Sequence, residues 1–418
     1  MRGILIFIII FGLLVFVHEF GHFWVAKKAG ILVREFSIGM GPKLFQTRRH
    51  ETAYTIRWLP LGGYVRLAGP DDAAELAPGT RMVLATDDAG LVTRIDASES
   101  DLPIAGTPVQ VVKADLVHAL TITGYENGDE SVTKTFQVSP HATIIDEHHN
   151  ELVIAPWNRQ FPQASIWQKL ATNVAGPLMN ILLGFVVFMI WTFVAVGPST
   201  TTIQKVSPGS PAAQAGLVKQ DRITQINQHK ITDFDQIGNL VAANGHKAMR
   251  VKVVRQGRTK TLTVTPKKVK VQGHSTYQLG ILAQPDNSAA AKLKRSWQTS
   301  MQTTGMIFSA VGDLFRSFSL NKLSGPVGIY SATAQVSKLG LASVLAFLAM
   351  ISINLGIVNL IPIPGLDGGK LLLNLIELVR GKPIKEEHEA IIDLIGVGIL
   401  LLLIIAVTGN DIYRYFIK

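Results

Sequence analysis

The stretch FGLLVFVHEFGHFWVAKKAG, residues 11–30, places two histidines and a carboxylate inside an otherwise apolar run. No side chain from residue 3 to residue 17 is ionisable, and the HEFGH residues 18–22 follow at once. An ionisable side chain inside a membrane span costs roughly 3 kcal/mol and is rarely kept without a function. We therefore interpret residues 3–26 as a membrane span that carries a functional site.

The composition indicates a membrane protein with no nucleic-acid partner. Of the 418 residues, 47% are hydrophobic and only 17% are charged, which is too apolar for an ordinary soluble protein. We attribute the net charge of +10 to lysines and arginines in cytoplasmic loops and near anionic membrane lipid. The chain has no cysteine, so any metal must be held by histidines and carboxylates.

Four apolar stretches are long enough to cross a bilayer, which requires about 20 residues each. They are residues 3–26, 174–197, 341–361 and 391–408. The distribution of lysines and arginines places loops 27–172 and 362–390 in the cytoplasm by the positive-inside rule. We predict a multi-pass cell-membrane protein with both termini outside and the HEFGH residues toward the cytoplasmic side. No small-x-small cleavage site follows the first span, so we expect it to be retained.

Hydropathy and turn residues divide the chain into eight regions. These are a first span (1–29), a membrane-associated β-hairpin (30–68), a cytoplasmic β-rich insertion (69–165), a second span (166–199), an extracytoplasmic domain (200–283), an amphipathic helical region (284–340), a third span (341–380), and a fourth span with the C-terminal tail (381–418). Together they predict a polytopic α-helical membrane protein with two β-containing domains.

Three of these regions carry clear local patterns. Residues 52–68 alternate apolar and polar side chains around a Pro-Leu-Gly-Gly turn, and residues 249–266 do so around Gln-Gly, so both predict β-hairpins. Residues 289–318 have an apolar helical face with basic residues at its start. That pattern suits either a helix on the membrane surface or a core helix of the soluble domain.

The HEFGH residues can form half of a zinc site. On a helix, His18 and His22 are four positions apart, so both imidazoles project from one face and can bind a single Zn²⁺. Glu19 lies beside that face, where it can serve as a general base for a water molecule. The alternative is a cluster at a helix end that reaches toward lipid headgroups.

A catalytic zinc requires a third protein ligand, and Asp367 is the best candidate. It lies in NLIPIPGLDGG, where Pro362 and Pro364 break the third span and Gly368-Gly369 allow close approach of the backbone to a ligand. The alternative role for Asp367 is an N-cap of the helix that follows.

Two asparagines, Asn180 and Asn359, lie within spans. Either side chain could donate a hydrogen bond to a developing oxyanion or to a substrate backbone. The alternative is that they stabilise helix–helix packing.

Several motifs resemble the site-2 protease family of intramembrane zinc metalloproteases, in its bacterial regulator-of-sigma-E group (RseP-like and RasP-like). They are HEFGH, LPLGGYV, NVAGPLMN, SGPVGI and NLIPIPGLDGG, in the family's order. The resemblance covers most of the chain outside residues 69–160. SPAAQAGLVKQDRITQINQHKI resembles a PDZ signature, with Gln220 where that signature usually has Gly.

The resemblance implies roles for these residues. Three of the four spans would form the protease core, with one Zn²⁺ per chain held by His18, His22 and Asp367, and Glu19 as the catalytic base. Asn359 would position the substrate. The β element around Gly62-Gly63-Tyr64 would lie in the membrane and receive an unwound substrate segment by strand addition.

The resemblance also implies substrates and regulation. The enzyme would cut transmembrane segments of single-span proteins, such as anti-sigma factors and remnant signal peptides, after a first extracytoplasmic cut by another protease. The PDZ domain would act outside the membrane as a size filter. Two other readings are a catalytically silent membrane scaffold that captures peptide ends through its PDZ domain, and a metal-ion transporter. The complete set of ligands and base disfavours the scaffold, and the scarcity of polar residues in spans two and four disfavours the transporter.

Overall fold

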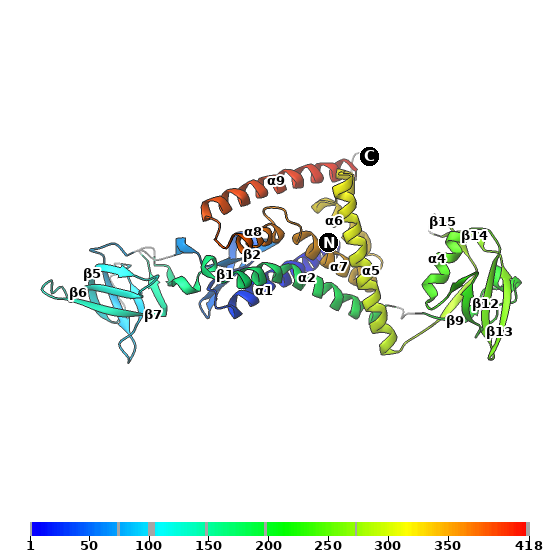
Figure 1. Ribbon diagram of the computed structural model, residues 1–418, viewed down its shortest axis with the longest axis horizontal. Coiled ribbons are helices and arrows are strands. Elements are labelled where there is room, and N and C mark those ends of the chain that lie inside the picture. Colours follow the sequence, from blue (N-terminus) through cyan, green and yellow to red (C-terminus); the bar gives the residue numbers. More distant parts are fainter. Residues whose placement is uncertain are drawn as a thin grey trace. The chain divides into compact units, whose positions relative to one another are not determined.

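The computed structural model describes residues 2–72, 76–98, 105–146, 149–195, 199–271 and 274–414 (Figure 1). The chain divides into two compact units. The first comprises Met1–Gly184, Thr304–Gly340 and Phe347–Lys418, and the second comprises Phe185–Thr303 and Leu341–Ala346. The candidate site lies in the first unit.

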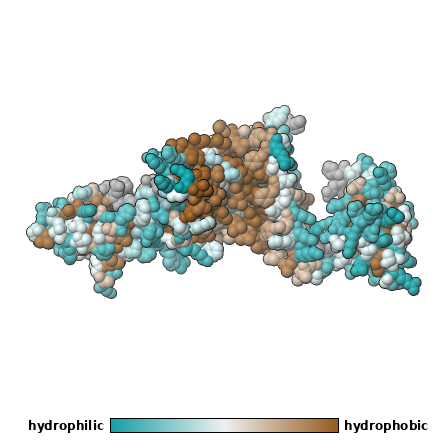
Figure 2. Space-filling view, viewed as in Figure 1, coloured by the Kyte–Doolittle hydropathy of each residue, from teal (hydrophilic) through white to brown (hydrophobic). Residues whose placement is uncertain are grey.

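The four predicted spans are long apolar helices. They are α1 (Arg2–Lys28), α2 (Ile166–Val194), α7 (Leu341–Asn359) and α9 (Glu386–Ile412), each long and apolar enough to cross a membrane. The predicted end of the second span, residue 197, lies outside the described residues. Figure 2 shows apolar side chains gathered over these helices, whereas the β-rich parts present mostly hydrophilic residues. These four helices therefore fit a multi-pass membrane protein, as the sequence predicts.

Small residues bring three of these helices into close contact. A Cβ atom on Gly21 of α1 would lie 2.5 Å from the carbonyl oxygen of Ala175 in α2, and one on Gly356 of α7 would lie 2.6 Å from that of Pro177. Without a hydrophobic driving force in lipid, such close backbone approach is a main source of helix association. The α1–α2–α7 contacts thereby set the positions of the residues that form the site.

Strands β1 (Val33–Arg49) and β2 (Thr52–Leu67) form a small sheet against α1. Glu35 in β1 is paired with both Ala53 and Arg66, so the first half of β1 lies between the two halves of β2. The predicted hairpin over residues 52–68 is therefore wrong, because those two halves do not pair with each other. The physical reason is that Gly63 marks a close approach to another element rather than a tight hairpin turn.

The two-residue turn of this sheet is His50–Glu51, and both residues have positive φ, 47° and 67°. A type I′ hairpin turn requires this conformation, which costs a non-glycine residue about 1–2 kcal/mol. Glu51 is held there by Arg159, whose Nη1 and Nη2 donate to its carboxylate at 3.0 and 2.5 Å, and by His141 Nδ1 at 2.8 Å. The turn is thereby tied to His141 in β7 (Thr133–Ile145) of the insertion and to Arg159, which follows its last strand.

Within the predicted β-rich insertion, the described residues between 76 and 155 form six strands. They are β3 (Arg81–Thr86), β4 (Val92–Asp96), β5 (Thr107–Asp115), β6 (Thr121–Glu126), β7 (Thr133–Ile145) and β8 (Glu151–Val153). The order is β4-β3-β5-β6-β7-β8, and a parallel β4–β7 pairing closes five of them into a ring. Leu84, Ile95 and Ile122 are fully buried inside it. Short 3₁₀ helices flank it at Pro70–Asp72, Trp157–Arg159 and Phe161–Gln163.

The second unit contains a sheet of six strands in the order β13-β12-β10-β9-β16, with β11 on β10, and a separate β14–β15 hairpin. Its elements are β9 (Ser199–Val206), α3 (Pro211–Gln214), β10 (Arg222–Ile226), β11 (His229–Lys230), α4 (Phe234–Asn244), β12 (Met249–Arg255), β13 (Arg258–Val264), β14 (Lys267–Val271), β15 (His274–Gln278) and β16 (Ile281–Pro285). The hairpin predicted around Gln256-Gly257 is confirmed, since Arg255 pairs with Arg258.

Gln220 stands where a PDZ signature usually has glycine. Gln220 has a φ of 72°, so its backbone adopts the left-handed conformation that glycine favours. The next residue, Asp221, is fully buried and accepts hydrogen bonds from Arg255 Nε and Nη2 at 2.7 and 2.8 Å. Burial opposes ionisation, but the Arg255 hydrogen bonds prevail and lower the pKa of Asp221.

The remaining helices are α5 (Ala289–Arg316), α6 (Pro326–Val336) and α8 (Asp367–Arg380), with a 3₁₀ turn at Leu320–Lys322. The apolar side chains of α5 are exposed, Trp297 at 60% and Phe315 at 69%, so the alternative of a core helix is wrong. In the SGPVGI motif, the buried Asp411 carboxylate of α9 accepts from the backbone N–H groups of Gly325 and Gly328, both at 2.8 Å. The motif thereby joins α6 to α9.

Candidate metal centre

Three side chains from two distant parts of the chain converge on one point. His18 and His22 lie one helical turn apart on α1, and Asp367 is the first residue of α8. The Asp367 Oδ2 atom lies 3.1 Å from His18 Nε2 and 3.3 Å from His22 Nε2, and the two nitrogens are 3.4 Å apart. Among the described residues, these three are the group of His and carboxylate side chains placed to hold a metal ion.

The spacing of these three atoms fits a zinc ion. Ligand atoms at about 2.0–2.1 Å from a tetrahedral ion lie about 3.3–3.4 Å from one another, which is close to the observed separations. Two imidazoles and one carboxylate are also a known ligand set of catalytic zinc, which leaves the fourth position open. Asp367 does not act as an N-cap, since α8 has Leu366 at that position and no side-chain cap.

His22 is held in the tautomer that a metal requires. Its Nδ1 atom lies 2.7 Å from the backbone carbonyl oxygen of Thr172 in α2, to which it donates. The proton is therefore on Nδ1, and the lone pair of Nε2 is free for a metal.

His18 has a partner on the same helix α2. The Asn180 side chain is fully buried, and its Nδ2 atom is placed 3.2 Å from His18 Nδ1. Asn180 Oδ1 has no hydrogen-bond partner among the described residues. The two orientations of an asparagine amide differ by a 180° rotation that exchanges its nitrogen and oxygen. Exchanging them lets His18 Nδ1–H donate to Asn180 Oδ1, which satisfies the buried oxygen and leaves His18 Nε2 free for zinc.

Glu19 lies between the histidines and the small sheet. A Cβ atom on Gly63 of β2 would lie 3.2 Å from Glu19 Cγ, and 2.7 Å from the Ser37 carbonyl oxygen of β1. The lack of a side chain at Gly63 therefore lets the sheet pack directly against the expected catalytic base. Gly62, with a φ of 78°, packs against Met40 instead.

The Tyr64 side chain is fixed by its neighbours. Its hydroxyl donates to Glu35 Oε2 at 2.8 Å and lies 2.6 Å from Arg57 Nη2, which also bonds to Glu35 Oε1 at 3.0 Å. Burial tends to raise the pKa of Glu35, but hydrogen bonds from Thr55, Tyr64 and Arg57 outweigh it and lower that pKa. This charged cluster holds β1 and both halves of β2 together beside Glu19.

Two residues that shape the site were missed by sequence reasoning. A Cβ atom on Gly176 of α2 would lie 2.1 Å from His22 Nε2, so only glycine leaves room for that ring. The role of Thr172 could not be predicted, because it acts through its backbone carbonyl and not through its side chain. Gly176 could have been noticed as a glycine inside a span. Gly368 and Gly369, expected to face a ligand, instead pack against the carbonyl oxygens of Ile361 and Ile363, at 2.1 and 2.5 Å from their Cβ positions.

The two predicted asparagines occupy different places. Asn180 contacts His18, as described above. Asn359 is the last residue of α7 and is half-buried, and the structure does not bring it into the group of three ligand atoms. Its role in positioning a substrate stays a prediction. Asn354 on the same helix is exposed despite lying within a span, and sequence reasoning did not single it out.

Comparison with known proteins shows the family to which the chain belongs. The model of "Peptidase family M50" matches residues 6–403. The chain is 44% identical over 421 residues to "Probable protease eep" of Enterococcus faecalis, covering 100% of both chains. It is 46% identical over 424 residues to a "Putative zinc metalloprotease" of Streptococcus pyogenes serotype M1, again covering 100% of both. A protein of the same description from Lactococcus lactis is 41% identical over 428 residues, covering 99% of this chain and 98% of its own.

These matches extend over the spans, the small sheet and the ligand residues. They confirm the family resemblance that the motifs indicated, and with it the expectation of a proteolytic enzyme. Together with the convergence of His18, His22 and Asp367 beside Glu19, they establish that the chain belongs to peptidase family M50.

Proposed function

We propose that the chain is an intramembrane zinc endopeptidase that hydrolyses peptide bonds in the transmembrane segments of single-span proteins. The observation that carries this proposal is the convergence of His18, His22 and Asp367 beside Glu19, on a helix apolar enough to cross a membrane. Zinc is supported by the ligand spacing and by the names of the relatives from S. pyogenes and L. lactis.

The residues divide the chemical work between them. A zinc ion held by the three ligands would activate a water molecule and polarise the scissile carbonyl as a Lewis acid. Glu19 accepts the proton of the attacking water and then delivers it to the amide nitrogen of the leaving segment. Thr172 and Asn180 hold the two imidazole rings in the orientation in which both Nε2 atoms would be available to the metal.

A transmembrane substrate must unwind before it can react. Its peptide groups are engaged in i→i−4 hydrogen bonds, which hide the carbonyl from attack. We infer that the sheet beside Glu19 receives the unwound segment as an added strand. The contact between Gly63 and Glu19 supports this role, because it places strand backbone next to the base.

The substrates we propose are anti-sigma factors and remnant signal peptides, reached after a first extracytoplasmic cut. Residues 200–283 would form a PDZ domain that excludes substrates not yet trimmed. The orientation proposed from the basic loops puts this domain outside the cell and the metal centre toward the cytoplasm.

The decisive experiment separates metal binding from catalysis. Purified protein should retain about one zinc per chain, and Glu19→Gln should abolish cleavage of a reconstituted single-span substrate while zinc content is unchanged, because Glu19 is not a ligand. Asp367→Ala should instead reduce zinc content. Retained cleavage by Glu19→Gln would show that another group is the base, and unchanged zinc in Asp367→Ala would exclude its role as a ligand.

A further inference from the structure

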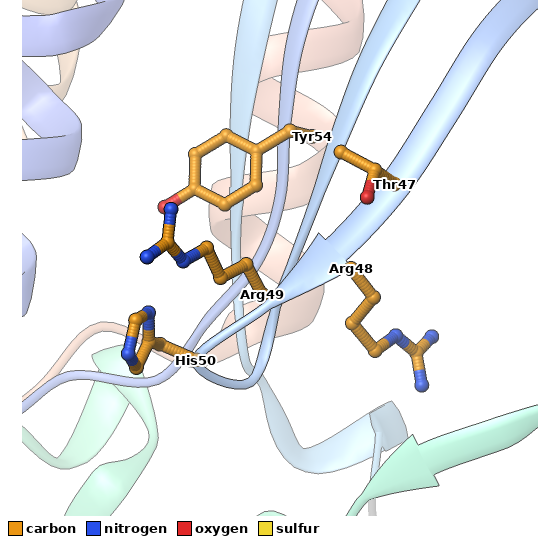
Figure 3. Close-up of a pocket in the computed structure, with 5 residues that line it drawn as sticks. All are labelled: Thr47, Arg48, Arg49, His50 and Tyr54. Carbon is orange, nitrogen blue, oxygen red and sulfur yellow. The ribbon is translucent and has the colours of Figure 1, made fainter.

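The turn of the small sheet contains a cationic pocket with no role in the proposed chemistry. It has a volume of about 560 Å³ and is lined by Thr47, Arg48, Arg49, His50 and Tyr54. In Figure 3 the guanidinium of Arg49 lies beside the Tyr54 hydroxyl, with the His50 ring on the same side, whereas the Arg48 side chain points away. The side chains of Arg49, His50 and Tyr54 can all donate a hydrogen bond and lie on the same side of the turn, which suits an oxyanion.

The positive charge of this pocket comes from Arg48 and Arg49. In the described part of the chain, neither Arg48 nor Arg49 forms an ion pair with a carboxylate. The nearest acidic residue along the chain, Glu51, is already engaged by Arg159 and His141. An arginine beside a tyrosine hydroxyl and a histidine, without a carboxylate, leaves room for an anion from outside.

The pocket is also built rather than accidental. The Tyr54 ring packs against Phe23 of α1 and Phe36 of β1, with ring centres 5.9 and 6.2 Å apart, so its hydroxyl is held in place. His50 is kept in a left-handed conformation that a glycine or asparagine would adopt more easily. Unfavourable backbone conformations of this kind cluster at functional sites.

The position of the turn identifies the source of the anion. Lys27 Nζ, at the end of α1, donates to the His50 carbonyl oxygen at 3.0 Å. Lys28 lies over the Trp24 ring at 4.0 Å, a pairing typical of the membrane–water interface. If α1 spans the membrane, the pocket therefore lies at the level of the lipid phosphates.

We propose that this pocket binds the phosphate of an anionic membrane phospholipid, with Arg49, His50 and Tyr54 as the groups that contact it. The bound lipid would fix how deeply the β1–β2 sheet lies in the membrane. Gly63 of the same sheet packs against Glu19. The proposal requires only that α1 spans the membrane, so it does not depend on the proteolytic activity.

The test uses full-length protein in a neutral detergent and measures its thermal unfolding midpoint. Short-chain phosphatidylglycerol, phosphatidylcholine of the same chain length, and inorganic phosphate are titrated separately. We expect phosphatidylglycerol to raise the midpoint in a saturable way, with little effect of the other two at equal concentration. Equal responses to both lipids would overturn the selectivity for an anionic headgroup. An equal response to inorganic phosphate would mean that the pocket takes a soluble anion instead.

Arg48 provides a matched control for Arg49, since the two are adjacent and carry the same charge. Arg49→Gln should raise the half-saturating concentration of phosphatidylglycerol about tenfold, because a charge-assisted contact is lost. Arg48→Gln should raise it no more than about threefold. Equal losses would mean diffuse attraction to a charged surface and would refute a defined site. If Arg49→Gln does not fold, Tyr54→Phe removes only the hydroxyl, and unchanged lipid binding in that variant would refute the proposal as well.

Discussion

A histidine that binds a metal through Nε2 carries its proton on Nδ1, and that proton needs an acceptor. His22 has the Thr172 carbonyl for this purpose, and His18 has the Asn180 amide, 3.2 Å away. From the sequence, Asn180 could either donate a hydrogen bond to the substrate or stabilise helix–helix packing. The structure instead places its amide against a ligand, where it orients the ring.

Replacing Asn180 should therefore weaken metal binding. Asn180→Leu removes the acceptor of the His18 proton, and the zinc affinity should fall about 10–100-fold, as is common when such a partner is lost. Asn180→Asp keeps an acceptor and should retain most of the affinity. Competition with a zinc-chelating dye measures both variants without reference to activity. Equal affinity for wild type and Asn180→Leu would exclude this positioning role.

Gly176 should be intolerant of even one methyl group. The added Cβ would lie 2.1 Å from His22 Nε2, so Gly176→Ala must displace the ring from the metal position, and we expect loss of both zinc and cleavage. Gly12→Ala is the matched control, because Gly12 also lies within a span and, apart from its own helical backbone and chain neighbours, no described atom lies within 4 Å of its Cβ position. Similar zinc contents in the two variants would contradict the packing described above.

At the scale of an element, the small sheet shows why the sequence predicted strands correctly but paired them wrongly. Alternation over residues 52–68 correctly predicted β structure, and both halves of that segment are part of β2. The glycines were interpreted as a hairpin turn, whereas Gly63 serves close packing against α1. A glycine in a strand allows either outcome, and only the partner element, distant in sequence, decides between them.

The Glu51 turn should make the joint between this sheet and the insertion sensitive to acid. Partial burial tends to raise the pKa of Glu51, but hydrogen bonds from Arg159 and His141 prevail and lower it from 4.5 to about 2. The ionised carboxylate therefore stabilises the fold fully above pH 4.5, and this stabilisation is lost as the pH falls toward 2. Because the group is partly exposed, we expect about 1 kcal/mol.

The measurement compares thermal unfolding of the wild type and Glu51→Gln between pH 7 and pH 2.5. The variant should be less stable at pH 7, and the difference should shrink as the pH falls. Glu126→Gln is the control, since the ion-pair partner of Glu126 among the described residues is the exposed Lys134. A Glu51→Gln difference that is constant with pH would show that the ion pair does not stabilise the turn.

On the scale of the whole molecule, the metal centre brings together His18 and His22 from the N-terminal helix and Asp367 from the C-terminal part of the chain. The ligand set was predictable because two histidines one helical turn apart require a third ligand, and Asp367 lies at a broken span end. The contributions of α2 could not be predicted from the sequence. The position of the Thr172 carbonyl and the space beside Gly176 depend on how one helix is rotated against another. Periodicity identifies a membrane helix, but an all-apolar surface does not indicate which face meets which neighbour.

Zinc should therefore stabilise the first unit and leave the second unchanged. The ligands join α1 to α8 within the first unit, and an ion that binds only the folded state adds its binding free energy to that fold. Removal of zinc by 1,10-phenanthroline should increase hydrogen exchange in α1 and α8 but not in strands β9–β13. His22→Ala should show high exchange in these helices with or without the chelator. Increased exchange in both units, or a chelator effect that persists in His22→Ala, would mean that the ion acts elsewhere than between these two helices.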